Sequence, residues 1–290
     1  MQNVKIITHS GCDLTQDMVT GLDINILPDL VVFGDEQYLN HVSIHPEEFY
    51  ARIESGDVFP TSAHPTLSDF MNAFRSAAQD HEEILCIVMS SQMTSTVNTA
   101  TLAANLLKEE EDFASRIYIY DSMQVSFGMG FAVYQAAEMA KAGASAQQII
   151  DFLDELVPRI GVYFVMNSLK YARKGGRIGA IRAIGADALG LKPLLSFRDG
   201  TVSDIKLNRR FSDGVQAIFQ KYQTLADLDS PDVYIFHACN EKDALQLEEW
   251  IRAFNPKART RLHIVGPVVG IYTGIGCVGI SFKEKEKEPK

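Results

Sequence analysis

The sequence predicts an α/β protein with two α/β domains, and three observations carry this prediction. Short apolar runs alternate with segments whose apolar residues recur at helical spacing, which is typical of a parallel or mostly parallel sheet covered by helices. The chain has 290 residues, enough for two domains of ordinary size. The composition changes from Gly161 onward and we place the boundary close to Pro158, so we expect domains at residues 1–158 and 159–282, followed by a charged tail at residues 283–290.

The composition excludes several classes of protein. Hydrophobic residues make up 46% and charged residues 22%, and no apolar run approaches the length of a membrane span, so we expect no membrane insertion. A net charge of −10 repels the phosphate backbone and argues against nucleic-acid binding. The first residues lead directly into a strand-like run without a secretory signal, which favours the cytoplasm. The four cysteines lie far apart without ligand spacing, so neither a metal site nor a disulfide framework is expected.

The centre of the first domain is the apolar run at residues 84–89, which we expect to be a strand buried on both faces. Helical spacing follows at residues 97–110, and the junction between them is rich in hydroxyl groups. The first N–H groups of a helix lack intrahelical partners, and the helix dipole is positive there, so this turn could hold a carboxylate or phosphate. Simple capping by Thr94 or Ser95 is the alternative, and the residues alone leave both open.

The other elements of the first domain are predicted from periodicity and turn residues. A first strand at residues 4–7 ends in a polar turn at residues 8–13, and two extended segments flank the turn Gly34-Asp35. A short helix begins at Pro46, and Thr66 with Asp69 forms the capping-box pattern of the next helix. A strand at residues 117–120 and helices at residues 127–142 and 146–156 complete the domain.

Hydroxyl-bearing residues follow several of these predicted strands. In a parallel sheet, ligands bind at the carboxyl ends of the strands, so these residues are expected to gather at one edge. Two prolines fix the backbone around Thr61 and Ser62, which strengthens their candidacy. The full set is Ser10, Thr61, Ser62, Ser90, Ser91, Thr94, Ser95, Thr96 and Ser122.

The second domain begins with a local basic region that stands out on an acidic protein. Its cations are Lys170, Arg173, Lys174, Arg177, Arg182, Lys192 and Arg198. A hairpin with its turn at Asp199-Gly200 follows, then helices at residues 211–222 and 241–254 around a strand at residues 233–236. The turn at residues 174–177 is interpreted as an anion-binding turn, a protein-docking surface or a plain exposed turn.

Other catalytic and cofactor motifs are absent or out of context. The chain has no Gly-x-Ser-x-Gly elbow and no Walker A loop. Residues 274–279 match Gly-x-Gly-x-x-Gly, but an apolar run follows instead of a helix, which argues against a dinucleotide cofactor. His9 and His64 adjoin the hydroxyl-rich loops and would be the general bases of an enzyme acting on a small carboxylate or phosphate ester.

Seven motifs, in order along nearly the whole chain, resemble those of the DegV family of bacterial proteins. They are Thr8-His9-Ser10 with Asp13-Leu14, Pro60-Thr61-Ser62, residues 90–96, Asp121-Ser122, residues 174–178, Lys192-Pro193 with Asp199-Gly200, and residues 266–279. The resemblance implies two α/β domains of the EDD fold, with one fatty acid buried between them. It also implies a binding protein with no catalytic residue and no cofactor, which presents the fatty acid to a fatty-acid kinase for acyl-phosphate formation in phospholipid synthesis.

The resemblance also implies roles for individual residues. Carried over by position, Thr61 and Thr94 hold the carboxylate, and Ser62, Ser91 and Thr96 lie nearby. The basic residues Arg173, Lys174 and Arg177 face the kinase. Three positions depart from the family pattern: His9 replaces an aspartate, Ser95 replaces a glycine, and Tyr272 replaces a histidine that contacts the carboxylate. Tyr272 can still donate a hydrogen bond to the ligand.

Overall fold

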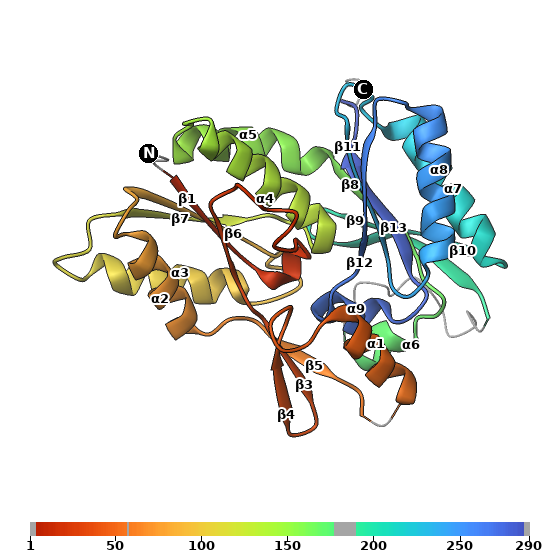
Figure 1. The fold of residues 1–290 in the computed structure, drawn as a ribbon, viewed down its shortest axis with the longest axis horizontal. Helices are drawn as coiled ribbons and strands as arrows, with labels where there is room; N and C mark the ends of the chain where they lie inside the picture. The colour runs from red at the N-terminus through yellow and green to blue at the C-terminus, as the bar shows by residue number, and fades with distance from the viewer. Residues whose placement is uncertain (1–3, 57, 177–189, 287–290) are drawn as a thin grey trace.

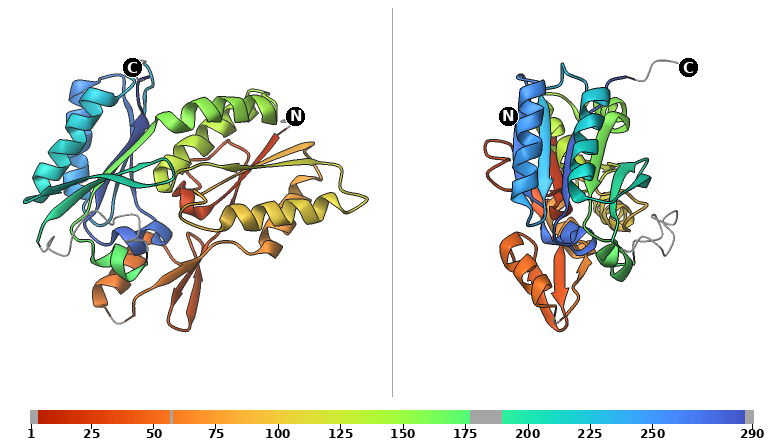
Figure 2. Two further views of the ribbon diagram at one scale, coloured as in Figure 1. Left: turned by 180° about the vertical axis from the view of Figure 1, so that it is seen from behind. Right: turned by 90° about the vertical axis from the view of Figure 1, so that its right-hand side faces the viewer.

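The computed structural model describes residues 4–56, 58–176 and 190–286. These residues form two large sheets that lie side by side, each with its own helices, and a small third sheet (Figure 1). The small sheet projects from the body formed by the two large sheets (Figure 2). The chain passes from the first large sheet to the second between Leu156, the last residue of α5, and Ile160, the first residue of β8.

The first large sheet is parallel, with the strand order β2-β1-β6-β7. Its strands are β1 (Val4–His9), β2 (Ile24–Leu27), β6 (Glu83–Val88) and β7 (Arg116–Asp121). Every residue of β6 is buried, as the apolar run at residues 84–89 predicts, and the charged Glu83 at its start is buried as well. Helices α2 (Leu67–Ala77) and α3 (Thr96–Lys108) cover one face, and α4 (Ser126–Lys141) and α5 (Ala146–Leu156) cover the other (Figure 1).

The second large sheet is mixed, with the strand order β10-β9-β8-β13-β11-β12. Its strands are β8 (Ile160–Val165), β9 (Lys192–Arg198), β10 (Thr201–Asn208), β11 (Asp232–His237), β12 (Arg259–Ile264) and β13 (Val278–Lys283). Only β11 and β12 pair in parallel, so the expectation of a mostly parallel sheet holds for the first sheet and not for the second. Helices α7 (Phe211–Leu225) and α8 (Glu241–Phe254) cover the outer face.

Helix α4 lies between the two large sheets and holds them together. Its Phe127 stacks on Phe236 of β11 with ring centroids 5.5 Å apart, and Phe131 meets Tyr234 edge-on. Gly128 faces Val162 of β8 so closely that an added Cβ would lie 2.7 Å from its side chain. Since these residues are fully or nearly fully buried, α4 serves as core for both sheets.

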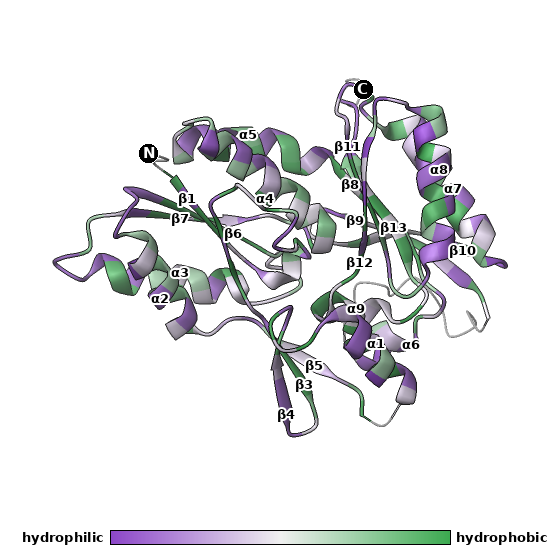
Figure 3. Cartoon of the chain, in the orientation of Figure 1, coloured by the Kyte–Doolittle hydropathy of each residue, from purple (hydrophilic) through white to green (hydrophobic). Residues whose placement is uncertain are grey.

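The small sheet is antiparallel, with the order β4-β3-β5, and adjoins the second half of the chain. Its strands are β3 (Leu30–Phe33), β4 (Glu36–Leu39) and β5 (Thr61–Ala63), and α1 (Pro46–Ser55) connects β4 to β5. Strand β4 is largely hydrophilic, whereas the central strands of the large sheets are hydrophobic (Figure 3). Helix α9 (Pro267–Thr273) packs against α1, β3 and β5, and α6 (Lys170–Lys174) packs against α9.

Several local predictions are confirmed, and others are wrong. Thr66 and Asp69 form the capping box of α2, and Asp199-Gly200 is the turn of the β9–β10 hairpin. The segment at residues 24–38 contains three strands rather than two, because β2 joins the large sheet while β3 and β4 form the hairpin. The glycine-rich segment contains α9 before β13. The charged tail expected at residues 283–290 is wrong at its start, because Lys283 ends β13 and Glu284 is buried, and residues 287–290 lie outside the described residues.

Asp13 joins three parts of the fold from a buried position. It follows the short helix η1 (Ser10–Cys12) in a left-handed conformation, accepts a hydrogen bond from the hydroxyl of Ser126 on α4, and accepts another from the N–H of Gly266 at 3.2 Å. Gly266 is the N-cap of α9. Burial raises the pKa of Asp13 from 3.8 to about 7, because the desolvation of the charged carboxylate outweighs these hydrogen bonds.

We therefore expect Asp13 to make stability fall as pH rises. The pKa of Asp13 is higher in the folded state than in the unfolded state, so the folded state favours the protonated carboxyl group. The stability that this protonated group contributes is fully present below pH 3.8 and is lost as pH rises through about 7. Asp13→Asn should gain stability relative to the wild type over this range, by as much as about 4 kcal/mol for a shift of this size. Urea unfolding between pH 4 and pH 8 measures the difference. The exposed control Asp112→Asn should change stability by less than about 0.5 kcal/mol at every pH.

Candidate functional site

A cavity lies between the first and second large sheets and is lined by residues from both halves of the chain. Its volume is about 220 Å³, far more than the roughly 10–15 Å³ that a single water molecule needs. The lining residues are His9, Asp29, Ser62, Ala63, His64, Met89, Met93, Thr94, Ser95, Thr96, Val125, Phe164, Met166, Ala172, Leu195, Phe197, Val202, Val268, Val269, Tyr272 and Thr273. The cavity therefore has room for an organic ligand of many atoms.

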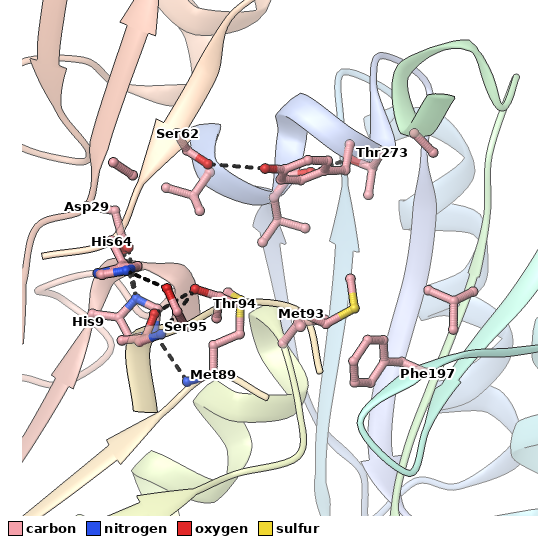
Figure 4. A pocket seen from close by; sticks show the side chains of 18 of the residues that line it. His9, Asp29, Ser62, His64, Met89, Met93, Thr94, Ser95, Phe197 and Thr273 are labelled. Atoms are coloured by element: carbon pink, nitrogen blue, oxygen red, sulfur yellow. Dashed lines mark hydrogen bonds and ion pairs between the residues drawn. The ribbon is translucent and has the colours of Figure 1, made fainter. Parts of the chain in front are cut away.

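The polar end of the cavity is formed where β1, β5, the turn before α3 and the helix α9 meet (Figure 4). Thr94 lies on the turn that follows β6, Thr96 is the first residue of α3, and their hydroxyl oxygens are 2.8 Å apart. The N–H of Thr96 donates to the Thr94 hydroxyl oxygen at 3.3 Å. This turn thus brings hydroxyl groups and the N-terminus of α3 to one wall of the cavity, the arrangement that the sequence predicts for an anion site.

Ser62 and Tyr272 close the polar end from the opposite side. Their hydroxyl oxygens are 3.3 Å apart, which joins β5 of the small sheet to α9 across 210 residues of sequence. The ring of Tyr272 lies over Gly175, where an added Cβ would lie 2.5 Å from the ring. Gly175 directly follows α6, the helix that carries the exposed cations Arg173 and Lys174. The polar end of the cavity is therefore in direct contact with the segment that carries these cations.

His9 and Asp29 form a buried pair that supports this wall. The His9 Nδ1 lies 2.9 Å from a carboxylate oxygen of Asp29, and Nε2 accepts the N–H of Met89 at 3.2 Å. Asp29 also accepts hydrogen bonds from the Ser10 hydroxyl and the Gly11 N–H. Both ring nitrogens of His9 are thus occupied, and its side chain is 1% exposed. This pairing fits a structural role better than that of a general base, which needs a free acceptor nitrogen facing its substrate.

His64 is held differently, with one nitrogen engaged by the backbone and the other by a hydroxyl. Its Nδ1 lies 2.9 Å from the carbonyl oxygen of Pro65, and its Nε2 lies 3.0 Å from the hydroxyl oxygen of Ser95. Ser95 is the N-cap residue of α3, yet its side chain accepts no capping hydrogen bond. Capping by the Ser95 side chain is therefore wrong. The Thr94 hydroxyl does accept the N–H of Thr96, the first residue of α3, so capping by Thr94 and an anion site both stay open.

The remainder of the cavity is apolar and comes mainly from the second half of the chain. Phe164 and Met166 come from β8 and the residue after it, and Leu195, Phe197 and Val202 come from the β9–β10 hairpin. The hairpin turn is fixed to the first sheet, because the Ser90 hydroxyl donates to the Gly200 carbonyl at 2.7 Å and the Gln92 side-chain amide donates to the Asp199 carbonyl at 2.9 Å. These two hydrogen bonds thus hold the apolar wall beside the hydroxyl-rich turn.

The structure brings together only some of the residues that the sequence selects. Ser62, Thr94, Thr96 and Tyr272 line the cavity, whereas Thr61 and Ser91 are exposed and do not. Ser10 and Ser122 are buried in other hydrogen bonds. Arg173 and Lys174 are exposed on α6, and Arg177 lies outside the described residues.

The sequence alone missed the residues that complete the cavity. The apolar wall carries no motif, because its side chains resemble those of any core strand. The hydrogen bond between His64 and Ser95 joins residues 31 positions apart, which no local pattern could reveal. In the part of the chain that the structure describes, no group of His, Cys, Asp or Glu side chains could hold a metal ion. Likewise, no helix among the described residues has the length and hydropathy needed to cross a membrane.

Comparisons with known proteins agree on one family. A family model described as "Uncharacterised protein, DegV family" matches residues 3–285. A DegV domain-containing protein of Clostridium perfringens is 29% identical over 100% of both chains. A solved DegV family protein from Thermus thermophilus, described by its fatty-acid binding, is 25% identical, with a TM-score of 0.88 over 97% of this chain and 99% of that one. DegV of Bacillus subtilis, described as a fatty acid binding protein, is 23% identical with a TM-score of 0.88 over 98% and 99% of the two chains, which concerns the fold alone.

Ser90→Ala should destabilise the protein by about 1–3 kcal/mol, because it leaves the buried Gly200 carbonyl without its hydrogen bond. Ser91→Ala is the matched control, since its exposed neighbouring side chain makes the expected change less than about 0.5 kcal/mol. Urea unfolding of both variants measures the difference. Equal stability of the two variants would show that the contact between the hairpin and the first sheet contributes little.

Proposed function

Because the chain belongs to the DegV family, we propose that it binds one long-chain fatty acid in the cavity between its two large sheets. The observation that carries this proposal is the division of the cavity into a hydroxyl-rich end and an apolar remainder. The similarity to the T. thermophilus protein, whose description names fatty-acid binding, supports the same ligand class. Among the described residues that line the cavity there is no lysine or arginine, and the hydroxyl groups are the donors that this proposal assigns to the head group.

The carboxylate binds between the two walls of the polar end. Thr94 and Thr96 on one side, and Ser62 and Tyr272 on the other, supply hydroxyl groups that can donate to carboxylate oxygens. A nearby helix N-terminus adds a favourable dipole without a full charge. Thr61 and Ser91 remain predictions of the resemblance, and the geometry favours Ser62 over Thr61 because only Ser62 lines the cavity.

The acyl chain lies along the apolar wall formed by β8 and the β9–β10 hairpin. Each methylene that leaves water contributes roughly 0.8 kcal/mol, so the tail of a long-chain fatty acid supplies most of the binding free energy. Hydroxyl groups then suffice to orient the head group. A permanent cation in this half-buried wall would be costly to desolvate whenever the cavity is empty.

The bound fatty acid is presented to a fatty-acid kinase in the cytoplasm, which converts it to an acyl phosphate for phospholipid synthesis. The exposed cations Arg173 and Lys174 on α6 form the docking surface, together with Arg177. Gly175, which directly follows this helix, contacts Tyr272 at the polar end of the cavity. In this role the protein is a carrier that needs no cofactor and leaves the bound fatty acid chemically unchanged.

We expect native mass spectrometry of the purified protein to show one bound fatty acid. Ser62→Ala with Thr94→Val removes one hydroxyl from each wall and should weaken dodecanoate binding at least tenfold, since two hydrogen bonds to a charged group are lost. Ser68→Ala, an exposed serine outside the cavity, is the control and should bind within twofold of the wild type, and Thr61→Ala tests the residue that the resemblance assigns. A wild-type protein that stays empty after incubation with dodecanoate, palmitate and oleate contradicts the proposal.

Charge reversal tests the docking surface separately. Arg173→Glu should abolish the association with a fatty-acid kinase of the same organism while dodecanoate binding is unchanged, because Arg173 is exposed and does not line the cavity. Lys242→Glu makes the same change in net charge on α8 and should leave the association intact. Surface plasmon resonance with immobilised kinase measures both variants. Retained association in Arg173→Glu would exclude Arg173 from the interface.

A further inference from the structure

We propose that Ser95 and His64 form a nucleophile–base pair that cleaves activated long-chain acyl esters and leaves the released fatty acid in the cavity. This activity rests on the proposed function for its acyl-binding site. It goes beyond carriage, because a free carboxylate is no electrophile and needs no nucleophile beside it. The pair instead acts on the acyl group before it becomes a free acid.

The hydrogen bonds of His64 fix the direction of proton transfer. A carbonyl oxygen can only accept, so the Pro65 carbonyl at 2.9 Å requires that Nδ1 carry the ring proton. Nε2 is then the acceptor, and the Ser95 hydroxyl donates to it at 3.0 Å. A hydroxyl bound to a base that is itself oriented by a third group is the structural signature of an activated serine.

Ser95 breaks the local rule for its position. Serine at an N-cap normally accepts an N–H of the first helical turn, which stabilises a helix by about 1 kcal/mol. The Ser95 side chain makes no such bond and points to His64 instead. A residue that departs from the usual pattern for its position, without a gain in stability, is typical of a functional site. The side chain is also exposed, so a substrate that enters the cavity can reach it.

The surrounding wall suits the transition state of acyl transfer. Ser95, His64 and Thr94 line the same end of the cavity, so the carbonyl of an acyl group whose tail lies along Phe197 reaches all three (Figure 4). The Thr94 hydroxyl and the N-terminal turn of α3 offer donors to the oxyanion that forms. Because Ser95 is at the exposed side of the cavity, the leaving group stays in solvent.

The reaction balances with water as the only other reactant. The Ser95 hydroxyl oxygen attacks the carbonyl carbon while its proton passes to His64 Nε2. The tetrahedral intermediate collapses, the bond to the leaving oxygen or sulfur breaks, and the leaving group takes the proton from His64. A water molecule, deprotonated by His64, then hydrolyses the acyl–Ser95 ester. The products are the fatty acid and the alcohol or thiol, and Ser95 regains its proton.

A fluorophosphonate with a dodecyl chain tests the nucleophile directly, because it forms a stable oxygen–phosphorus bond with an activated serine and releases fluoride. Intact-mass and peptide analysis should show one adduct, located on Ser95. Ser95→Ala should give none, and His64→Gln should slow labelling and the hydrolysis of p-nitrophenyl dodecanoate at least about 100-fold, the lower range for the loss of a general base. Ser68→Ala, an exposed serine outside the cavity, is the matched control and should react like the wild type.

Dodecanoate binding, measured on the same proteins, separates this proposal from the proposed function. If the Ser95→Ala and His64→Gln variants still bind dodecanoate, they are folded. Their loss of labelling then reports the loss of the nucleophile or of its base. A wild-type protein that binds dodecanoate but is not labelled, or an adduct that persists in Ser95→Ala, overturns the nucleophile–base pair. Labelling at Ser95 in a protein that does not bind dodecanoate supports the pair and contradicts the carrier function.

Discussion

The packing of α4 between the two large sheets is the constraint on which the rest of the structure depends. Its aromatic residues stack on β11, and its glycine at position 128 allows β8 to approach. Close packing of this kind fixes both the distance and the angle between the sheets. Val125, the residue just before α4, lines the cavity. The cavity is therefore the space that remains where α4 begins and the two sheets separate.

The chemistry of the cavity follows from which element reaches each end. The turn after β6 and the strand β5 bring hydroxyl groups, while β8 and the β9–β10 hairpin bring apolar side chains. Neutral donors suit a site that must exist both empty and filled, because a buried charge without its partner costs several kcal/mol. The same turn also carries Ser95, whose hydroxyl bonds to His64 rather than to its own helix. The proposed binding site and the proposed reactive pair thus share one wall.

Much of the fold is determined by local sequence, because local sequence sets backbone preference. Six consecutive apolar residues specify the buried strand β6, and Thr66 with Asp69 specifies the start of α2. Asp199-Gly200 specifies a hairpin because both residues adopt positive φ angles, which such a turn requires. The Gly-x-Gly-x-x-Gly match at residues 274–279 runs into β13 rather than a helix, in agreement with the sequence argument against a dinucleotide site. The place of the hydroxyl-rich turn, between a strand and a helix, likewise follows from local sequence.

Only the tertiary structure decided which side chains meet. Side chains alternate along a strand, so whether Thr61 or Ser62 faces the cavity depends on how β5 pairs with β3, which its own three residues do not specify. Ser62 meets Tyr272 across 210 residues and His64 meets Ser95 across 31, and neither separation leaves a local trace. Glu284 is buried because Tyr163 and Arg198 are there to bind it, although its segment has the charge pattern of a tail. The sequence by itself determined many of the elements and the place of the hydroxyl-rich turn, and long-range packing determined which side chains line the cavity.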